Sequence, residues 1–118
     1  MFSDLVLEHF QHPRNAGELP DADAKVEVSN PVCGDVLQLT AIHQEGRIRE
    51  VRFLCRGCTT AIACASMLTE RMLGAEVEAL RTITSDQLAE AIGGLPPASY
   101  HAAQLAEDAL KGLLRSLP

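Results

Sequence analysis

The sequence predicts a single α+β domain in which a three-stranded antiparallel sheet carries helices packed on one face. Residues 26–55 show the two-residue alternation of strands, whereas apolar residues recur at helical spacing before and after this stretch. A run of strands followed by a run of helices is typical of the α+β class. The chain has 118 residues, 47% of them hydrophobic, which suits one core. We therefore expect one domain over residues 1–118.

The first expected element is a helix over residues 3–12. Ser3 or Asp4 offers an N-cap, and residues 13–17 (PRNAG) end the helical pattern. The residues that recur at helical spacing and predict a short amphipathic helix are Phe2, Leu5, Val6, His9 and Phe10.

Three strands follow. The first contains Val26 and Val28 on one face, the second covers residues 36–42, and the third covers residues 48–55. Residues 43–46, including His43, have the character of a hairpin turn between the second and third strands. This order predicts an antiparallel meander whose last strand places on one side Val51, Phe53 and Cys55.

Helices make up the rest of the chain. A helix is expected from Thr59 to Gly74, and Thr84 begins a capping box with Gln87 before a second helix. A last helix is expected over residues 98–116. The residues predicted to face inward are Ala61, Ala65, Leu68 and Met72 in the first of these helices and Leu105, Ala109 and Leu113 in the last.

Charge and composition argue against several classes of function. The net charge is −6, with 16 acidic and 10 basic residues, so a nucleic-acid backbone would be repelled. No apolar run approaches the ~20 residues needed to cross a bilayer. The first residues lack the features of a signal or transit peptide, so we expect a cytoplasmic protein. In that reducing compartment the four cysteines should remain thiols, which favours metal or sulfur chemistry over disulfides.

The first motif that carries chemistry is NPVCGD at residues 30–35. If this segment is extended, Cys33 and Asp35 are two residues apart and project to the same side. A thiolate and a carboxylate would then face one site. The alternative is a turn in which Cys33 is buried packing and Asp35 accepts hydrogen bonds from local amides.

The second motif is the C-x-x-C pair formed by Cys55 and Cys58. Cys58 lies where the following helix begins, and there the free amides and the macrodipole favour a thiolate. This spacing suits two ligands of one metal ion or a redox dithiol. Cys55 is equally compatible with an apolar position in the core. Cys64 shares a helical face with Ala61 and Leu68, so we expect it to be core packing.

Among the four histidines, His101 is the best candidate ligand because it lies in the first turn of the last helix, just after the LPP sequence at residues 95–97. His9, His12 and His43 are expected to be solvated or half-buried polar residues.

Four segments together resemble the IscU/NifU-type scaffold family: NPVCGD, GCTTAIA at residues 57–63, HPRNAG at residues 12–17, and LPPASYH at residues 95–101. They occur in the order and approximate spacing of that family and span nearly the whole chain. The resemblance implies a three-stranded sheet packed against helices. It also implies a scaffold that binds iron, accepts sulfur from a cysteine desulfurase, assembles a transient two-iron two-sulfur cluster and passes it to recipient apoproteins. An iron or electron donor such as ferredoxin is a further implied partner.

Carried over by position, Cys33 and Cys58 match the family's first two ligand cysteines, Asp35 matches its aspartate, and His101 matches the histidine beside the third cysteine. The chain departs from the family at Ala102, where that third cysteine usually stands. It also has Ala-Ser at residues 98–99, where the motif for a dedicated chaperone has Val-Lys, so docking of a chaperone is in doubt.

The departure at Ala102 leaves three hypotheses. In the first, the protein remains a scaffold with Cys33, Asp35, Cys58 and His101 as ligands and Cys55 as a possible substitute thiolate. In the second, the same four residues bind Zn²⁺ and the protein is a SufU-like sulfur acceptor that stimulates a desulfurase without holding a cluster. In the third, it only binds partner proteins. None is an enzyme, because the sequence shows no nucleophile–base pair and no cofactor cradle.

Overall fold

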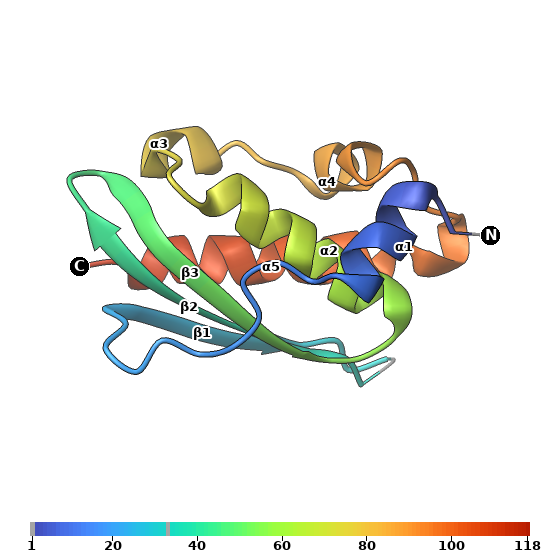
Figure 1. Cartoon of the computed structure of the whole chain (residues 1–118), viewed down its shortest axis with the longest axis horizontal. Helices are drawn as coiled ribbons and strands as arrows, with labels where there is room; N and C mark the ends of the chain where they lie inside the picture. Colours follow the sequence, from blue (N-terminus) through green and yellow to red (C-terminus); the bar gives the residue numbers. More distant parts are fainter. Residues whose placement is uncertain (1, 33) are drawn as a thin grey trace.

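The computed structural model describes residues 2–32 and 34–118. One layer is the sheet, a second layer of two helices packs against one face of it, and the shorter helices lie beside or over that second layer (Figure 1). The predicted α+β class is confirmed. In chain order the elements are α1 (Asp4–Gln11), β1 (Ala24–Ser29), β2 (Val36–Gln44), β3 (Arg47–Arg56), α2 (Thr59–Met72), α3 (Val77–Leu80), α4 (Ser85–Ala91), the 3₁₀ turn η1 (Pro97–Ser99) and α5 (His101–Ser116).

The sheet is an antiparallel meander in the order β1-β2-β3, as predicted. The hairpin turn is Glu45-Gly46, with φ values of 54° and 76°, the conformation that suits the twist of a two-residue hairpin. The predicted turn at residues 43–46 was therefore placed too early. His43 lies within β2, and its N–H donates a hydrogen bond to the Asp23 carboxylate at 3.1 Å.

Helix α1 buries less of its apolar surface than its sequence suggests. Ser3 caps the helix as predicted, since its hydroxyl accepts from the Val6 N–H at 3.1 Å. In the helix only Val6 and His9 are buried, whereas Leu5 is 46% exposed. Only part of the predicted amphipathic face is buried, because α1 packs mainly against α2. Three apolar residues of the predicted amphipathic pattern are exposed: Phe2, Leu5 and Phe10.

His9 was expected to be solvated or half-buried, and that expectation was wrong. It is 4% exposed, because the side of α1 that carries it lies against α2. Its Nδ1 lies 2.8 Å from the hydroxyl of Ser66, which supplies a buried partner for the ring.

The helical half follows the prediction closely. The capping box is present: Gln87 N–H donates to the Thr84 hydroxyl, and the Thr84 N–H donates to the Gln87 side chain. Helix α3 was not predicted, and α5 begins at His101 rather than at residue 98 because η1 precedes it. None of the described helices combines the length and apolar character needed to span a membrane. All of the predicted inward positions are buried: Ala61, Ala65, Leu68, Met72, Leu105, Ala109 and Leu113.

Candidate metal centre

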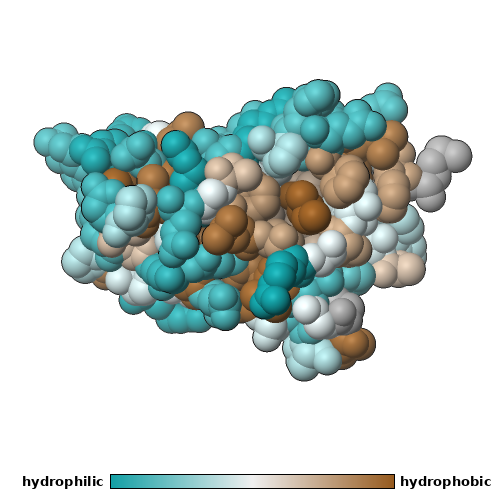
Figure 2. All heavy atoms as spheres, turned by 60° about the horizontal axis from the view of Figure 1, so that its bottom comes forward, coloured by the Kyte–Doolittle hydropathy of each residue, from teal (hydrophilic) through white to brown (hydrophobic). Residues whose placement is uncertain are grey.

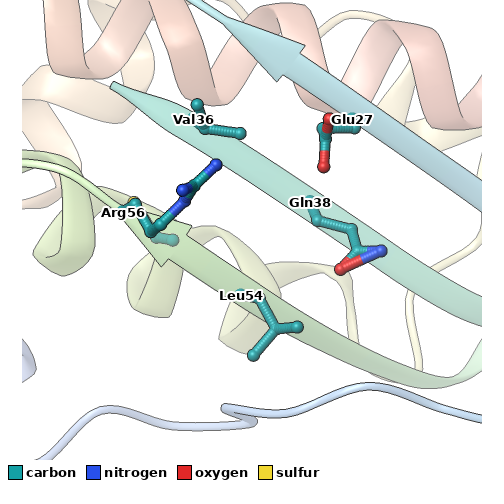
Figure 3. Close-up of a pocket in the computed structure, with 6 residues that line it drawn as sticks. Glu27, Val36, Gln38, Leu54 and Arg56 are labelled. Carbon is teal, nitrogen blue, oxygen red and sulfur yellow. The ribbon is translucent and has the colours of Figure 1, made fainter. Parts of the chain in front are cut away.

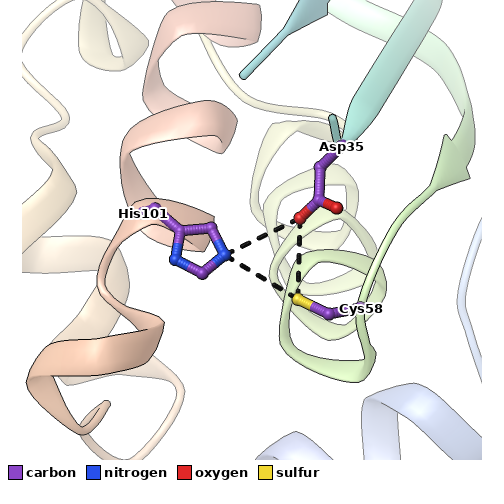
Figure 4. A group of neighbouring side chains, drawn as sticks. All are labelled: Asp35, Cys58 and His101. Atoms are coloured by element: carbon purple, nitrogen blue, oxygen red, sulfur yellow. Dashed lines mark hydrogen bonds and ion pairs between the residues drawn. The ribbon is translucent and has the colours of Figure 1, made fainter. Parts of the chain in front are cut away.

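Strand β2 and helices α2 and α5 all begin at the same end of the molecule, on the right of Figure 1. Asp35 directly precedes β2, Cys58 is the N-cap residue of α2, and His101 is the first residue of α5. Their side chains turn toward one another (Figure 4). Asp35 Oδ2 lies 3.6 Å from Cys58 Sγ and 3.7 Å from His101 Nε2, and Sγ lies 3.9 Å from Nε2. Three predicted site residues therefore converge.

A hydrogen-bonded turn presents Asp35 to this site. The Val32 N–H donates to Asn30 Oδ1 at 2.9 Å, and the Gly34 N–H donates to the Asn30 carbonyl at 2.7 Å. Gly34 has φ +77°, a conformation that glycine adopts without steric cost. The backbone carbonyl of Asp35 closes the turn by accepting from the Asn30 N–H at 2.8 Å. Because Asp35 is only 6% exposed, its carboxylate has little access to water.

Cys58 presents its sulfur to the same site, since the sulfur makes no capping hydrogen bond to the amides of α2. Its backbone has the extended conformation of an N-cap, and its carbonyl accepts from the Ile62 N–H at 3.1 Å. The side chain makes no capping hydrogen bond. The thiol is exposed and is directed at Asp35 and His101.

His101 enters from α5 with a half-buried ring whose side chain is 30% exposed. The preceding residue, Tyr100, donates its hydroxyl hydrogen to Asp86, which ties the start of α5 to α4. Nε2 is the atom that faces Asp35 and Cys58. Binding a cation through Nε2 requires the neutral tautomer with its proton on Nδ1.

The donor set of this site fits a metal ion. Zinc bonds of about 2.0–2.3 Å in tetrahedral geometry separate neighbouring ligand atoms by about 3.3–3.6 Å. The three observed separations, 3.6, 3.7 and 3.9 Å, are within a few tenths of an ångström of that range. A cation among them would also offset the cost of burying the Asp35 carboxylate. Within the described residues, all ligand atoms of this group lie within 4.8 Å of one another.

Of the remaining three cysteines, the two that the structure describes are not among the three converging donors. Cys33, the fourth predicted ligand, lies outside the described residues, so its place in the site remains a prediction. Cys64 is fully buried, as predicted, and burial raises the pKa of its thiol to about 12. Cys55 is half-buried, and desolvation, followed by the charges of Asp35 and Cys58, raises its pKa to about 12. Cys55 is not part of the Asp35–Cys58–His101 group.

The open face of the sheet carries a shallow pocket of about 310 Å³ near this end of the molecule. Figure 3 shows its labelled side chains standing on the face of the sheet opposite α5. Hydrophobic residues also gather near the middle of the surface in Figure 2, with hydrophilic residues around them. No convergent set of ligand atoms forms there within the described residues, so the pocket is not the metal centre. It is lined by Glu27, Val36, Gln38, Leu54, Cys55 and Arg56.

A family model described as the NifU-like N terminal domain matches residues 1–116. This chain belongs to that family. Its resemblance to IscU/NifU-type scaffolds, predicted from the sequence, is thereby confirmed.

Relatives with curated names agree. The chain is 46% identical over 111 residues to the iron-sulfur cluster assembly scaffold protein IscU 1 of Archaeoglobus fulgidus, covering 94% of this chain and 72% of that protein. It is 41% identical over 118 residues to the scaffold protein IscU of Azotobacter vinelandii, covering 97% and 91%. The predicted role in iron–sulfur cluster assembly is confirmed by these relatives, which are named as scaffolds.

A solved structure supports the fold of this NifU-like domain. The N-terminal part of a NifU-like protein from Brucella abortus superimposes with a TM-score of 0.67 at 18% sequence identity. The match covers 97% of this chain and 81% of that one. The predicted fold is therefore confirmed by comparison as well as by the strand order.

Proposed function

We propose that this chain assembles a transient two-iron two-sulfur cluster at Asp35, Cys58 and His101 together with Cys33, and passes it to recipient apoproteins. The observation that carries the proposal is the convergence of three donor atoms from three separate elements within 4 Å. The cluster is cargo in this function. Carboxylate and imidazole hold iron less tightly than thiolate, so this ligand set favours release.

The missing third cysteine is consistent with such a mixed ligand set. Ala102 is 1% exposed, so its methyl group contributes to the core of the domain. Two irons need four terminal ligands, which Cys33, Asp35, Cys58 and His101 supply in number. Cys55 is a weaker candidate for a substitute ligand, because it is half-buried and does not belong to the group of converging ligand atoms.

Sulfur would be accepted from a cysteine desulfurase on an exposed thiolate, for which Cys58 is suited. The thiolate attacks the outer sulfur of the desulfurase persulfide, a new S–S bond forms on this chain, and the desulfurase thiolate leaves. Reducing two such sulfurs to sulfide takes four electrons. Two ferrous ions supply two of them, and a donor such as ferredoxin supplies the rest. We expect this exchange to take place in the cytoplasm.

A second candidate function is a zinc-binding sulfur acceptor that stimulates the desulfurase and holds no cluster. The ligand separations of 3.6–3.9 Å favour it, because they already approach those around a single tetrahedral ion. Zn²⁺ would be held by Asp35, Cys58 and His101 with Cys33 as a fourth ligand, and would stabilise the thiolates. Sulfur would then be carried only as a cysteine persulfide.

Anaerobic reconstitution tests these functions against each other. The purified chain is incubated with ferrous iron, cysteine, a cysteine desulfurase and a reductant, and then assayed for iron, zinc, acid-labile sulfide and transfer to an apo-ferredoxin. Iron and sulfide in equal amounts, followed by activation of the ferredoxin, are expected for the scaffold. Persulfide on Cys58 or Cys33 with bound zinc and no labile sulfide would instead establish the zinc-binding acceptor. If the chain gives neither a transferable cluster nor a persulfide, both functions are rejected.

A further inference from the structure

Gly57, between Arg56 at the end of β3 and the site residue Cys58, packs unusually close to Asp35. A Cβ atom added at Gly57 would lie 2.8 Å from Asp35 Cγ, 2.9 Å from Oδ1 and 3.1 Å from Cβ. Carbon atoms that are not bonded pack at about 3.5–4.0 Å, so no side chain fits there unless Asp35 moves. The three nearest atoms all belong to Asp35.

The requirement for glycine at this position comes from space and not from backbone conformation. The φ of Gly57 lies outside the left-handed region, in contrast to Gly34 at +77°. Alanine could therefore adopt the backbone conformation of Gly57. The closest contacts in its way would be those between its methyl group and the Asp35 side chain.

The atoms in contact also show which way the effect would go. Gly57 faces Oδ1 and Cγ of Asp35, whereas Oδ2 faces Cys58 Sγ and His101 Nε2. A carboxylate is a rigid planar group, so pressure on Oδ1 and Cγ is passed to Oδ2. Because Asp35 is 6% exposed, packed atoms limit where it can move.

We propose that Gly57 is a positioning residue. Because it has no side chain, the Asp35 carboxylate has room to lie within ligand distance of Cys58 and His101. The effect on ion binding rests on the proposed function of the site. The placement of the Asp35 carboxylate does not depend on that function, so it can be measured in the ion-free protein.

The first experiment compares crystal structures of the ion-free wild type and Gly57→Ala. Relief of a 2.8 Å contact needs a shift of about 1 Å. The separation of Asp35 Oδ2 from Cys58 Sγ is therefore expected to change from 3.6 Å by a similar amount. An Asp35 carboxylate that keeps its position in Gly57→Ala would overturn the proposal, whatever the protein binds.

The second experiment is a double-mutant cycle on zinc affinity, measured by competition with a chromophoric chelator. Gly57→Ala is expected to weaken Zn²⁺ binding by about 10–100-fold, the usual effect of disturbing the support of a ligand. Combined with Asp35→Ala it should weaken binding no further than Asp35→Ala alone, because the group it displaces is gone. Full additivity of the two changes would contradict the proposal.

Gly112→Ala serves as the matched control. A Cβ at Gly112 would lie 2.8 Å from Val26 Cγ2, an equally tight contact between α5 and β1 that involves none of the site residues. This variant is expected to unfold at lower temperature while it keeps wild-type zinc affinity. Equal losses of zinc affinity in both variants would assign the Gly57 effect to general destabilisation. A wild type that binds neither zinc nor cluster would refute the proposed function, and the crystal comparison would still decide the role of Gly57.

Discussion

Two histidines lie beside α2, one near a serine within the helix and one near its N-cap cysteine, and the distances to these partners differ. His9 is 4% exposed, and its Nδ1 lies 2.8 Å from the Ser66 hydroxyl. His101 is half-buried, and its Nε2 lies 3.9 Å from Cys58 Sγ. The first separation is that of a hydrogen bond, whereas the second is close to the distance between two ligands of one ion.

Both ring nitrogens of His9 face polar side chains. The Ser66 hydroxyl accepts from the Arg14 N–H at 2.8 Å, and the same oxygen lies 2.8 Å from His9 Nδ1. His9 Nε2 faces the Glu70 carboxylate at 3.6 Å. The comparison indicates that the His9 cluster fixes α1 on α2, while Asp35, Cys58 and His101 have the wider spacing that the proposed ion site requires.

The largest expected effect is the loss of ion binding in Cys58→Ala. Removal of this ligand should weaken zinc affinity by more than about 100-fold, since changes outside the ligand set already cost about 10–100-fold. The chelator competition assay measures it. Cys64→Ala is the control on the same helix: its thiol is buried, so its zinc affinity should equal that of the wild type. Unchanged zinc affinity in Cys58→Ala would show that the Asp35–Cys58–His101 group does not bind the ion and does not differ from the His9 cluster in this respect.

Ion binding should also stabilise the fold. At a free zinc concentration 100 times its dissociation constant, the free energy of unfolding is expected to rise by about 2.7 kcal/mol. Urea unfolding with and without zinc measures this gain. The gain should vanish in Cys58→Ala and persist in Ser66→Ala. The opposite pattern would indicate that the ion binds near His9 and not near His101.

Ser66→Ala should lower stability by about 1–3 kcal/mol, because it leaves His9 Nδ1 and the Arg14 N–H without their partner. The change is read from the urea midpoint of the ion-free protein. Zinc affinity should remain that of the wild type. A variant as stable as the wild type would show that the His9 cluster does not fix α1.

The smallest expected effect is a pH dependence of stability from His9. Burial, assisted by Arg14, lowers the pKa of His9 below 6.5, although Glu70 and Glu8 oppose the shift. The unfolded chain therefore binds more protons than the folded chain at mildly acidic pH. The contribution of neutral His9 to the free energy of unfolding is thus fully present above pH 6.5 and is lost as the pH falls below that value. Urea unfolding of the ion-free protein between pH 8 and 5 should show a steeper loss for the wild type than for His9→Asn. Equal pH profiles would contradict this origin.

The site could be largely predicted because its residues lie at sequence signals for the starts of elements. Asp35 follows a turn marked by proline and glycine, and Cys58 begins the helical pattern. Each signal is local, so one sequence suffices to place it. The convergence with His101 came from the family resemblance, because no local pattern predicts which helix ends meet.

The burial of His9 could not be predicted for the opposite reason. Its partner Ser66 is 57 positions away and has no distinctive sequence context. Periodicity marked an apolar face on α1 but not how much of it α2 would cover. Helix α3 has four residues, too few for any periodic pattern to show.

The wide sequence separation of the ligands has a consequence for the order of events during synthesis. Cys58 lies 23 positions from Asp35 and 43 positions from His101, which opens the last helix. A chain still emerging from the ribosome would have the first two groups well before the third. We therefore expect ion loading to wait until α5 has formed, because a chain without His101 lacks one of the three converging donors.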